Sequence, residues 1–440
     1  MRCGSTRRTQ RTPIPIAPKL RHGVPLWLNK AAPTRTYSTL RGRLHADIVI
    51  IGGGITGAIC AYLFARAGIG VVLLESNLVA RGSTAASTAL LMHEPDRDFT
   101  DLAARFGRPT TRRIWSALAR ATRDLSATIA ELKRDTDLCR CDSVYFTLEP
   151  ERVAALRREF TARKKAGMPG RWLSPAALYR MTGIRAQAAI LTSGNAQVDP
   201  VKTSCAFLEA AAAAGAQIFE RSKARGVKAS KDTVEVRTGA GRVTARRVIV
   251  ATGYATAEFR GLVGRFTTKD TYVVATRRLP ARVLPTGIVR GSRASGRRRR
   301  LVMAWDTSRP YHYLRWTGDG RLLVGGADTN HRSAKGSRGR IALARGRLLE
   351  YLAQVQPQLA SEQPEYEWEG LFAETPDGLP YIGAHSRYPG HLFALGYGGN
   401  GMTASFLAAR MLLDLYQARD KGRQQSRAHA NLFAFQRGRR

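Results

Sequence analysis

The chain has 440 residues, of which 44% are hydrophobic and 24% charged, the composition of a soluble globular protein large enough for two domains. It holds no apolar run of about 18 residues free of glycine and charge, so we expect no membrane span. The formal net charge of +38 would suit a nucleic acid or an anionic membrane, but the 71 basic residues are spread along the chain and only 12 are lysine. This spread favours a general bias in arginine usage, and we expect no specific nucleic-acid partner.

Both ends of the chain are basic. Residues 1–44 are predicted to be a largely disordered N-terminal extension, because residues 1–46 carry ten basic residues, no acidic residue and no apolar signal core. The extension is either an organellar transit peptide or a simple basic arm. Residues 421–440 are predicted to be a basic C-terminal tail.

The cysteines bear on the compartment and on metal binding. The chain has five of them: Cys3, Cys60, Cys139, Cys141 and Cys205. They are too few and too scattered for a disulfide framework, which predicts a reducing, cytoplasmic compartment. Cys139 and Cys141 form C-x-C without a second cysteine pair or a nearby histidine, so no metal site is predicted.

Residues 48–75 predict the first unit of a dinucleotide-binding domain. Ile48–Ile51 is a short β-branched run, the composition of a buried parallel strand. A G-x-G-x-x-G turn follows it, formed by Gly52, Gly54 and Gly57. The first glycine lets the chain turn, the second lets the backbone approach a pyrophosphate, and the third lets the helix pack on the strand.

The second half of this unit bears on the kind of nucleotide. A helix over 58–67 ends at Gly68, and a second strand ends at Glu75. The Glu75 carboxylate can accept hydrogen bonds from both hydroxyls of an adenosine ribose, but it would repel a 2′-phosphate. We therefore expect a dinucleotide without that phosphate, which disfavours NADP.

The nucleotide pattern is then interrupted and returns much later. The segment 101–135 has apolar residues near helical spacing and predicts one long amphipathic helical stretch, and strand-like residues resume at 143–148. After residue 197 come a helix stopped by Gly215 and strands over 226–229, 233–237 and 243–251. The last strand enters an A-T-G turn at Ala251, Thr252 and Gly253, which suits the floor of a dinucleotide domain.

A second glycine-rich helix start lies in the segment 391–417. There a strand runs into a glycine cluster and then into a helix; the glycines are Gly396, Gly398, Gly399 and Gly401. The positive end of that helix can stabilise the negative charge that a reduced flavin gathers on its pyrimidine ring. One glycine-rich start for a pyrophosphate and another for a redox ring favour FAD. An NAD-dependent Rossmann enzyme, and a non-catalytic basic flavin-fold protein that binds nucleic acid or a membrane surface, stay open as alternatives.

The combined pattern resembles the D-amino-acid oxidase superfamily of FAD-dependent amine oxidoreductases, which includes glycine oxidase and sarcosine oxidase. Besides Glu75, the matching segments are DIVIIGGGITG (47–57), RGSTAAST (81–88), VIVATGY (248–254), DGLPYIG (377–383) and GYGGNG (396–401). The segment 305–326 looks most like the γ-glutamylputrescine oxidoreductase branch. The resemblance implies an α/β fold (α+β overall), with a Rossmann-like FAD-binding domain and a substrate domain on a mixed or antiparallel sheet.

The resemblance also implies domain boundaries and a cofactor site. We expect a discontinuous FAD-binding domain over 45–95, 191–260 and 366–420, and a substrate-binding domain over 96–190 and 261–365. The residues implied in binding FAD are Gly52, Gly54, Ile55, Thr56, Gly57, Glu75, Ser83, Thr84, Ala224, Ala251, Thr252, Gly253, Gly399, Asn400, Gly401 and Met402. The FAD is expected to be non-covalent, because members with covalent flavin carry a cysteine where this chain has Gly370.

Three departures from the family's pattern bear on the substrate and the electron acceptor. Amino-acid-oxidising members often place a carboxylate-binding arginine where this chain has Phe372, and glycine oxidases carry a second one where it has Gly399. An amine is therefore favoured over an α-amino acid. Sarcosine oxidases use a lysine to activate oxygen at the place of Leu323, so the electron acceptor, O2 or another, stays open.

The segment 309–316 is the candidate wall of the substrate site. Three of its side chains alternate in sequence and should share one face: Tyr311, Tyr313 and Arg315. Their hydroxyls and guanidinium could orient a polar tail; alternatively, the tyrosines are core residues and Arg315 is a charge at the rim. His312 falls on the opposite face and is expected to be a hydrogen-bonded core residue. Trp305 either caps the pocket or packs in the core.

Together these patterns predict an FAD-dependent oxidoreductase that oxidises the C–N bond of a small amine or amino-acid-like substrate. Hydride would pass to N5 of the flavin, and the imine would be hydrolysed in water. This chemistry depends on orientation and on exclusion of solvent, so no catalytic triad is expected.

Overall fold

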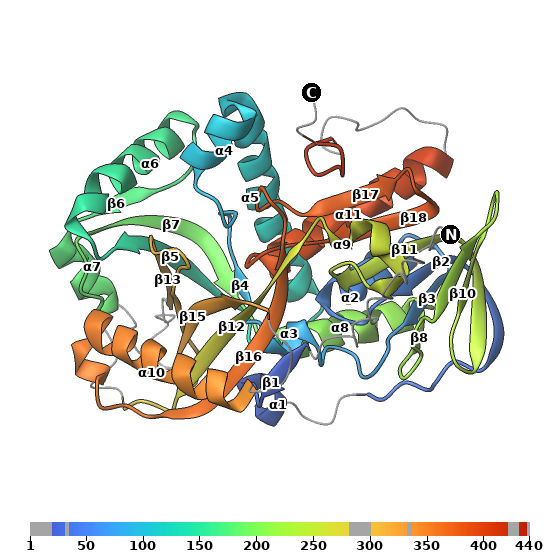
Figure 1. Cartoon of the computed structure of the whole chain (residues 1–440), viewed down its shortest axis with the longest axis horizontal. Helices are drawn as coiled ribbons and strands as arrows, with labels where there is room; N and C mark the ends of the chain where they lie inside the picture. Colours follow the sequence, from blue (N-terminus) through green and yellow to red (C-terminus); the bar gives the residue numbers. More distant parts are fainter. Residues whose placement is uncertain (1–19, 31–34, 281–300, 332–336, 421–430, 438–440) are drawn as a thin grey trace, which may run out of the picture.

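The computed structural model describes residues 20–30, 35–280, 301–331, 337–420 and 431–437. Within these ranges the chain forms two lobes, each built on one large β-sheet, with helices α5 (Arg108–Glu131) and α11 (Gly401–Asp420) near the middle (Figure 1). The α/β fold class expected from the sequence is confirmed.

One lobe contains an eight-stranded sheet with the parallel core of a dinucleotide-binding fold. Its strands are β2 (Gly42–Ile51), β3 (Val71–Leu74), β8 (Gln217–Phe219), β9 (Gly226–Ala229), β10 (Val234–Arg237), β11 (Gly241–Gly253), β17 (Tyr381–His385) and β18 (Tyr388–Leu395). The order is β17-β18-β11-β2-β3-β8, and the five strands from β18 to β8 run parallel. β9 and β10 extend β11 as an antiparallel ribbon.

Helices cover this sheet because its central strands are apolar on both faces. Ile48 and Ile50 pack against α2 (Ile55–Arg66), α8 (Pro200–Ala213) and α11, while Val49 packs into a second apolar cluster on the opposite face. All three side chains are fully buried, and each contributes about 2 kcal/mol of transfer free energy. Asp199 caps α8 by accepting hydrogen bonds from two N–H groups of its first turn.

The other lobe contains a ten-stranded mixed sheet. Its strands are β1 (Arg21–Gly23), β4 (Leu90–Leu91), β5 (Cys139–Thr147), β6 (Arg171–Leu173), β7 (Ala188–Gln197), β12 (Thr267–Thr276), β13 (Val302–Asp306), β14 (Tyr313–Trp316), β15 (Leu322–Asn330) and β16 (Pro364–Glu374). The order is β1-β16-β12-β15-β14-β13-β5-β7-β4, with β6 beside β7. β13 and β5 are parallel, and the neighbouring pairs are antiparallel, so the mixed sheet expected for the second domain is present.

The remaining helices are short or lie on the outside of the lobes. They are α1 (Leu26–Lys30), α3 (Ser83–Ala86), α4 (Phe99–Phe106), α6 (Val153–Lys165), α7 (Pro175–Thr182), α9 (Arg260–Val263) and α10 (Ser337–Val355), with 3-10 turns at Pro150–Arg152, Ala257–Phe259 and Pro357–Leu359. The single helical stretch predicted over 101–135 is instead two helices, α4 and α5. Gly107 separates them with φ of +78°, a backbone conformation that favours glycine and ends α4.

The chain crosses between the lobes at places other than those predicted. β7 and β16 lie in the ten-stranded sheet, although boundaries at 191 and 366 would give most of both strands to the FAD-binding domain. The reason is that a strand's sequence shows that it is buried but does not show which sheet it joins. Residues 45–89, 198–253 and 381–420 stay with the eight-stranded sheet and its helices.

Both chain ends contain ordered segments that the sequence analysis assigned to extensions. β1 pairs with β16, Leu26 and Trp27 in α1 are buried, and Leu40 is buried just before β2, which begins at Gly42. The disorder predicted over 1–44 is therefore wrong for residues 20–30 and 35–44. At the other end Phe433 and Phe435 are buried within the predicted tail, and Arg437 donates to Asp377 at 2.7 Å. These segments are ordered because aromatic residues within them find apolar contacts. Residues 1–19 and 421–430 lie outside the described residues.

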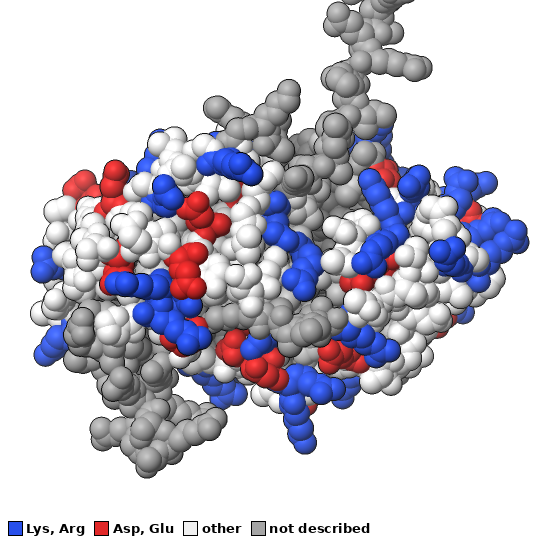
Figure 2. Space-filling view, turned by 90° about the horizontal axis from the view of Figure 1, so that it is seen from below, with Lys and Arg blue, Asp and Glu red and all other residues white. Residues whose placement is uncertain are grey.

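Charged side chains of both signs occur on the face of the molecule shown in Figure 2. On the face in Figure 2, basic residues are interspersed with acidic residues and with uncharged surface. The densest basic run of the sequence, 293–300, lies outside the described residues. None of the helices in the described part of the chain has the length and hydropathy of a bilayer-spanning segment.

Candidate active site

A cavity of about 1750 Å³ runs between the two lobes. Gly52 and Gly54, at the start of α2, line one part of it, and Gly399 and Gly401, at the start of α11, line another. Thr56 Oγ1 and Ser405 Oγ, one on each helix, form a 2.7 Å hydrogen bond. The two glycine-rich helix starts, far apart in sequence, therefore meet at one cavity. We call the part beside residues 52–57 the turn end. The part on the other side of Gly399, lined by Tyr311 and Tyr313, is called the chamber end.

Most of the predicted cofactor residues line this cavity. They are Gly52, Gly54, Ile55, Thr56, Glu75, Ser83, Thr84, Ala224, Ala251, Thr252, Gly253, Gly399, Gly401 and Met402. Two others lie just behind its wall. Gly57 packs against Gly52, where a side chain would overlap the Gly52 carbonyl oxygen, and Asn400 turns its amide toward the segment before α4. Gly57 therefore has the helix-packing position expected of the third glycine.

The turn end is built mainly from backbone. Gly52 has φ of +112°, and a Cβ there would lie 2.6 Å from the Ala251 carbonyl oxygen, so only glycine fits. Gly54 faces the cavity, and a Cβ there would lie 2.9 Å from Thr84 Oγ1. Thr84 Oγ1 also accepts a 3.1 Å hydrogen bond from the Ile55 N–H, which holds α3 beside the start of α2.

Glu75 closes the turn end. Its carboxylate accepts hydrogen bonds from the N–H groups of Gly53 at 2.7 Å and Asn77 at 2.8 Å, and from the Ser76 hydroxyl at 2.9 Å. The side chain that the sequence assigns to a ribose thus also ties the glycine turn to the end of β3. Ser83 donates to the Leu371 carbonyl at 2.7 Å, so α3 is anchored to β16 across the lobes.

The chamber end contains two of the three predicted substrate residues. Tyr311 and Tyr313 line it, with ring centroids 6.1 Å apart. The hydroxyl oxygens of Tyr313 and Thr271 lie 3.2 Å apart and form a hydrogen bond. Burial raises the pKa of both Tyr311 and Tyr313 well above the usual range. Trp305 also lines the chamber and stacks on Tyr145 at 5.5 Å, so the expectation that it caps the pocket is favoured over a core position.

Arg315 is not part of the chamber, which corrects the prediction. Its side chain is 2% exposed and donates to the carbonyl oxygens of Thr88 and Ala89, with the Trp27 ring 4.9 Å from its guanidinium carbon. Burial lowers its pKa to about 10. β14 continues past the end of the cavity, so a side chain two residues beyond Tyr313, roughly 7 Å further along the strand, meets α1 and the 88–89 loop instead.

His312 is hydrogen-bonded as expected, but its side chain is 22% exposed and is not a core residue. Its Nδ1 lies 3.0 Å from Asp306 Oδ2, and its ring stacks on Tyr351 with centroids 4.0 Å apart. The side chain is therefore partnered within the ten-stranded lobe and does not face the cavity.

Carboxylates that the sequence analysis did not identify also line the chamber. Asp96 accepts a short hydrogen bond from the Gly399 N–H, and burial raises its pKa to about 7. Asp328 lies on β15, and burial raises its pKa to about 6. Its Oδ1 has no hydrogen-bond partner among the described residues. Both pKa shifts show that the chamber disfavours a bare negative charge.

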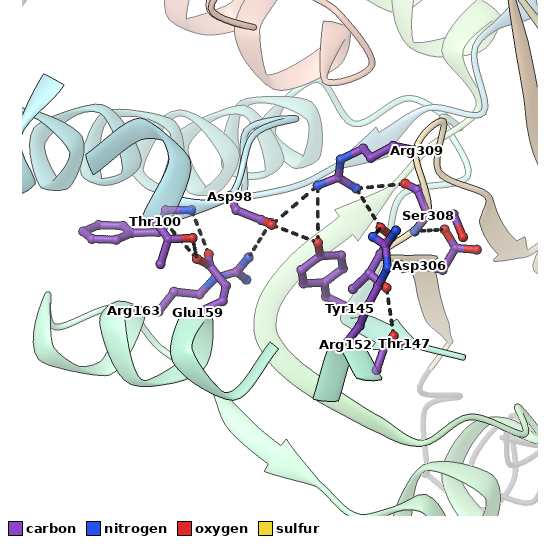
Figure 3. Close-up of polar contacts among 12 residues, drawn as sticks. Asp98, Thr100, Tyr145, Thr147, Arg152, Glu159, Arg163, Asp306, Ser308 and Arg309 are labelled. Carbon is purple, nitrogen blue, oxygen red and sulfur yellow. Dashed lines mark hydrogen bonds and ion pairs between the residues drawn. The ribbon is translucent and has the colours of Figure 1, made fainter. Parts of the chain in front are cut away.

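A charged network forms the far wall of the chamber (Figure 3). Asp98 lies between two arginines, 3.8 Å from Arg163 and 3.5 Å from Arg309, and accepts from the Tyr145 hydroxyl at 3.2 Å. Arg163 also donates to Glu159 at 2.6 Å, and both side chains are almost completely buried. Burial opposes ionisation of Glu159, but the guanidinium and the N–H donors at the start of α4 outweigh it and lower its pKa.

Most of these chamber residues carry no local sequence signature. They come from the segment before α4, from α6, from β5 and from the loop between β13 and β14, which meet only in the folded chain. One signal was available: Glu94, Asp96 and Asp98 alternate in the segment that follows the second matching motif. Alternation in an extended segment places side chains on one side.

The donors around the cavity fit a dinucleotide that carries a redox ring. Two helix N-termini open into one space, and at Gly54 the absence of a side chain leaves room for a phosphate. Glu75 and Thr252-Gly253 flank that position. In the described part of the chain, no group of three or more His, Cys, Asp or Glu residues could hold a metal ion.

Comparison with known proteins gives one family. The family model described as FAD dependent oxidoreductase (DAO) matches residues 47–415. The chain is 25% identical over 392 residues to γ-glutamylputrescine oxidoreductase of Escherichia coli, covering 88% of this chain and 86% of that protein. It is 25% identical over 389 residues to glycine oxidase of Geobacillus kaustophilus, covering 85% and 93% of the two chains. A crystal structure of glycine oxidase from Geobacillus kaustophilus superposes with a TM-score of 0.71 at 21% identity, covering 88% of this chain and 98% of that one.

Proposed function

The chain belongs to the DAO family of FAD dependent oxidoreductases, and we propose that it oxidises the C–N bond of a small amine. FAD, which accepts hydride in this chemistry, is the cofactor of the family. The alternative of an NAD-dependent Rossmann enzyme is therefore excluded. Gly52, Gly54 and Glu75 would hold the adenosine diphosphate half at the turn end, and Gly399 and Gly401 would meet the ring.

One observation carries the choice of an amine. The chamber end and the glycine turns belong to a single cavity. The chamber walls carry carboxylates and aromatic rings, and neither position expected for a carboxylate-binding arginine holds one. Phe372 lines the cavity at one such place and Gly399 at the other. Arg163 and Arg309 line the chamber too, but each already lies within 4 Å of an acidic side chain. A substrate with a positive charge suits these walls better than one with a free carboxylate.

The names of the relatives support this reaction class. γ-Glutamylputrescine oxidoreductase and glycine oxidase are named for nitrogen-containing substrates, and the chain covers most of the length of both. The substrate of this chain is proposed from its own chamber, because 25% identity does not carry a substrate across.

Within the site, the chain's own residues would bind, orient and exclude water. The stacked rings of Tyr145 and Trp305 supply apolar surface to the chamber, and the hydroxyls of Tyr311 and Tyr313 supply polar contacts. Such walls strengthen electrostatic interactions by lowering the local dielectric constant. FAD is proposed to be non-covalent, since none of the four described cysteines lines the cavity.

A cytoplasmic location is proposed as well. All four described cysteines are free, which supports a reducing compartment. Fractionation of the native source with detection of this chain tests the proposal, and recovery in an oxidising compartment would contradict it.

Anaerobic titration tests the proposed function. The purified protein should be yellow and should release FAD on denaturation, and a panel of small amines should bleach the flavin absorbance without oxygen. Admission of air then separates an oxidase, which recolours rapidly, from a dehydrogenase, which recolours slowly. A protein that stays colourless when incubated with FAD would contradict the proposal.

A further inference from the structure

The segment 94–98, here called the acidic segment, forms one wall of the chamber. Three of its side chains line the cavity: Glu94, Asp96 and Asp98. Its backbone is held by Asn400, the residue before α11. The Asn400 amide donates to the Glu94 carbonyl oxygen at 2.8 Å and, just ahead of the segment, to that of Met92 at 3.2 Å. The segment is therefore held in register with the glycine cluster that precedes α11.

The three carboxylates are not compensated equally. Glu94 and Asp98 lie 3.9 and 3.8 Å from Arg163, and Asp98 also lies 3.5 Å from Arg309. Asp96 forms no ion pair within 4 Å among the described residues, and its partner is the Gly399 N–H. Glu94 is 2% exposed, yet neither of its carboxylate oxygens has a hydrogen-bond partner in the described structure. The acidic segment thus presents more negative charge than its neighbours neutralise, which is costly unless a ligand supplies a cation.

The space beside Gly399 shows where such a cation would lie. Here a Cβ on Gly399 would overlap the Tyr311 hydroxyl and would lie 3.1 Å from Asp96 Oδ1. A phenol and a carboxylate therefore form the wall beside Gly399, and the carboxylate attracts a cation.

We propose that Asp96 binds the reacting ammonium group and accepts its proton, so that the substrate is an alkyl amine without an α-carboxylate. The inference rests on the proposed function and specifies its substrate. In the step assigned to Asp96, one N–H bond of R–NH3+ breaks and one O–H bond forms on the carboxylate. The products are the neutral amine and a carboxylic acid, and no electrons are exchanged. The neutral amine is the form whose lone pair supports C–N oxidation.

The pH at which Asp96 changes charge suits this transfer. Burial raises its pKa to about 7, against the hydrogen bond from the Gly399 N–H, which lowers it. Glu374 and Asp328 also raise the pKa of Asp96, and Arg97 lowers it. Tyr311 faces the same carboxylate and stays neutral, because burial raises its pKa well above 10. Near neutrality Asp96 can therefore bind a cation as a carboxylate, and it can also keep the proton that it accepts from the ammonium group.

A set of three ligands that cannot be oxidised tests the inference by binding alone. tert-Butylammonium, 2-aminoisobutyrate and tert-butanol have similar shapes, and none has hydrogen on the carbon that bears the nitrogen or oxygen. Each is titrated into the FAD-loaded full-length protein, and binding is followed by the change in the flavin absorption spectrum. We expect tert-butylammonium to bind at least about tenfold more tightly than the other two. Its affinity should rise with pH up to about 7 and then level off.

Variants assign the effect to Asp96. Asp96→Asn should lower the affinity for tert-butylammonium by about 10- to 100-fold and remove its pH dependence. The exposed Asp232→Asn, on the ribbon of β9 and β10, is the matched control and should behave like wild type. Asp96→Glu keeps a carboxylate and should keep the preference for the cation, with a shifted pH midpoint.

The outcomes separate this inference from the function on which it rests. Wild-type affinity and pH dependence in Asp96→Asn with normal FAD content, or tighter binding of 2-aminoisobutyrate by wild type, would overturn the role of Asp96 and leave amine oxidation standing. If Asp96→Asn loses FAD, an unchanged pH midpoint in Asp96→Glu overturns it instead. A wild-type protein that binds no FAD overturns both.

Discussion

The turn end and the chamber end of the cavity are built in opposite ways. At the turn end, backbone groups within residues 52–57 form most of the wall, and the glycines are required because they lack side chains. At the chamber end, charged and aromatic side chains make the wall, and partners such as Asp98 and Arg309 are 211 residues apart in sequence. The phosphate-binding part of a cofactor site can thus be specified by one short sequence motif. The substrate site depends instead on the packing of segments that are distant in sequence.

The largest expected effect tests the turn end. Gly54→Val should abolish retention of FAD, because a β-branched side chain would fill the cavity beside Thr84 and exclude the phosphate. The visible flavin absorbance per mole of purified protein measures it. Gly346→Val, on the exposed surface of α10 with open space around it, is the control and should keep its FAD. Full FAD occupancy in Gly54→Val would show that the phosphates bind elsewhere.

The next effect tests the chamber end through stability. Arg163→Met should destabilise the fold by about 3–5 kcal/mol, because it leaves Glu159, Glu94 and Asp98 without their shared cation. Urea unfolding of the two proteins measures the difference. Arg158→Met, on the exposed face of the same helix, should change stability by less than about 0.5 kcal/mol. Equal stability of Arg163→Met and wild type would mean that the network is not a structural unit.

A smaller effect is expected from the carboxylate of the turn end. Glu75→Gln should weaken FAD binding about tenfold, roughly 1.4 kcal/mol, because a neutral amide is a poorer acceptor for the N–H groups of Gly53 and Asn77 and for a ribose. Equilibrium titration of the cofactor-free protein with FAD gives the two dissociation constants. If Glu75→Gln binds FAD as tightly as wild type, the carboxylate serves the loop alone.

The smallest effect has the opposite sign. The pKa of Asp96 is raised to about 7 by burial, so the folded state favours the protonated side chain. Its contribution to stability is complete below the unfolded pKa, near 4, and is lost as the pH rises through about 7. Without cofactor, Asp96→Asn should therefore be more stable than wild type at pH values above about 7, by about 1 kcal/mol after allowance for solvent screening, and the gain should shrink toward about pH 5. Urea unfolding at both pH values measures it, and a loss of stability in the variant at the higher pH would contradict it.

The same contrast explains what could be predicted from the sequence. The strand before Gly52, the glycine turn, Glu75 and the helix after Gly401 depend on local composition and spacing, and the structure places all of them as expected. Arg315 was misplaced because alternation gives the face of a strand but not the point at which a cavity ends. Arg163 was missed because a single charged residue has no local signature when its partners lie in other elements. The one local sign of Asp96 was its alternation with Glu94 and Asp98.

Because residues 20–30 are ordered, the choice of N-terminus for recombinant protein affects the site. Trp27 covers the buried guanidinium of Arg315 and donates to the Ser87 carbonyl at 2.9 Å, beside the loop that lines the turn end. Recombinant protein trimmed to the family match at residue 47 would lose this aromatic cover together with β1. Arg315 would then face water on one side, and the loop over the nucleotide would lose a fixed support. A gene designed for crystallisation should therefore begin ahead of Leu20.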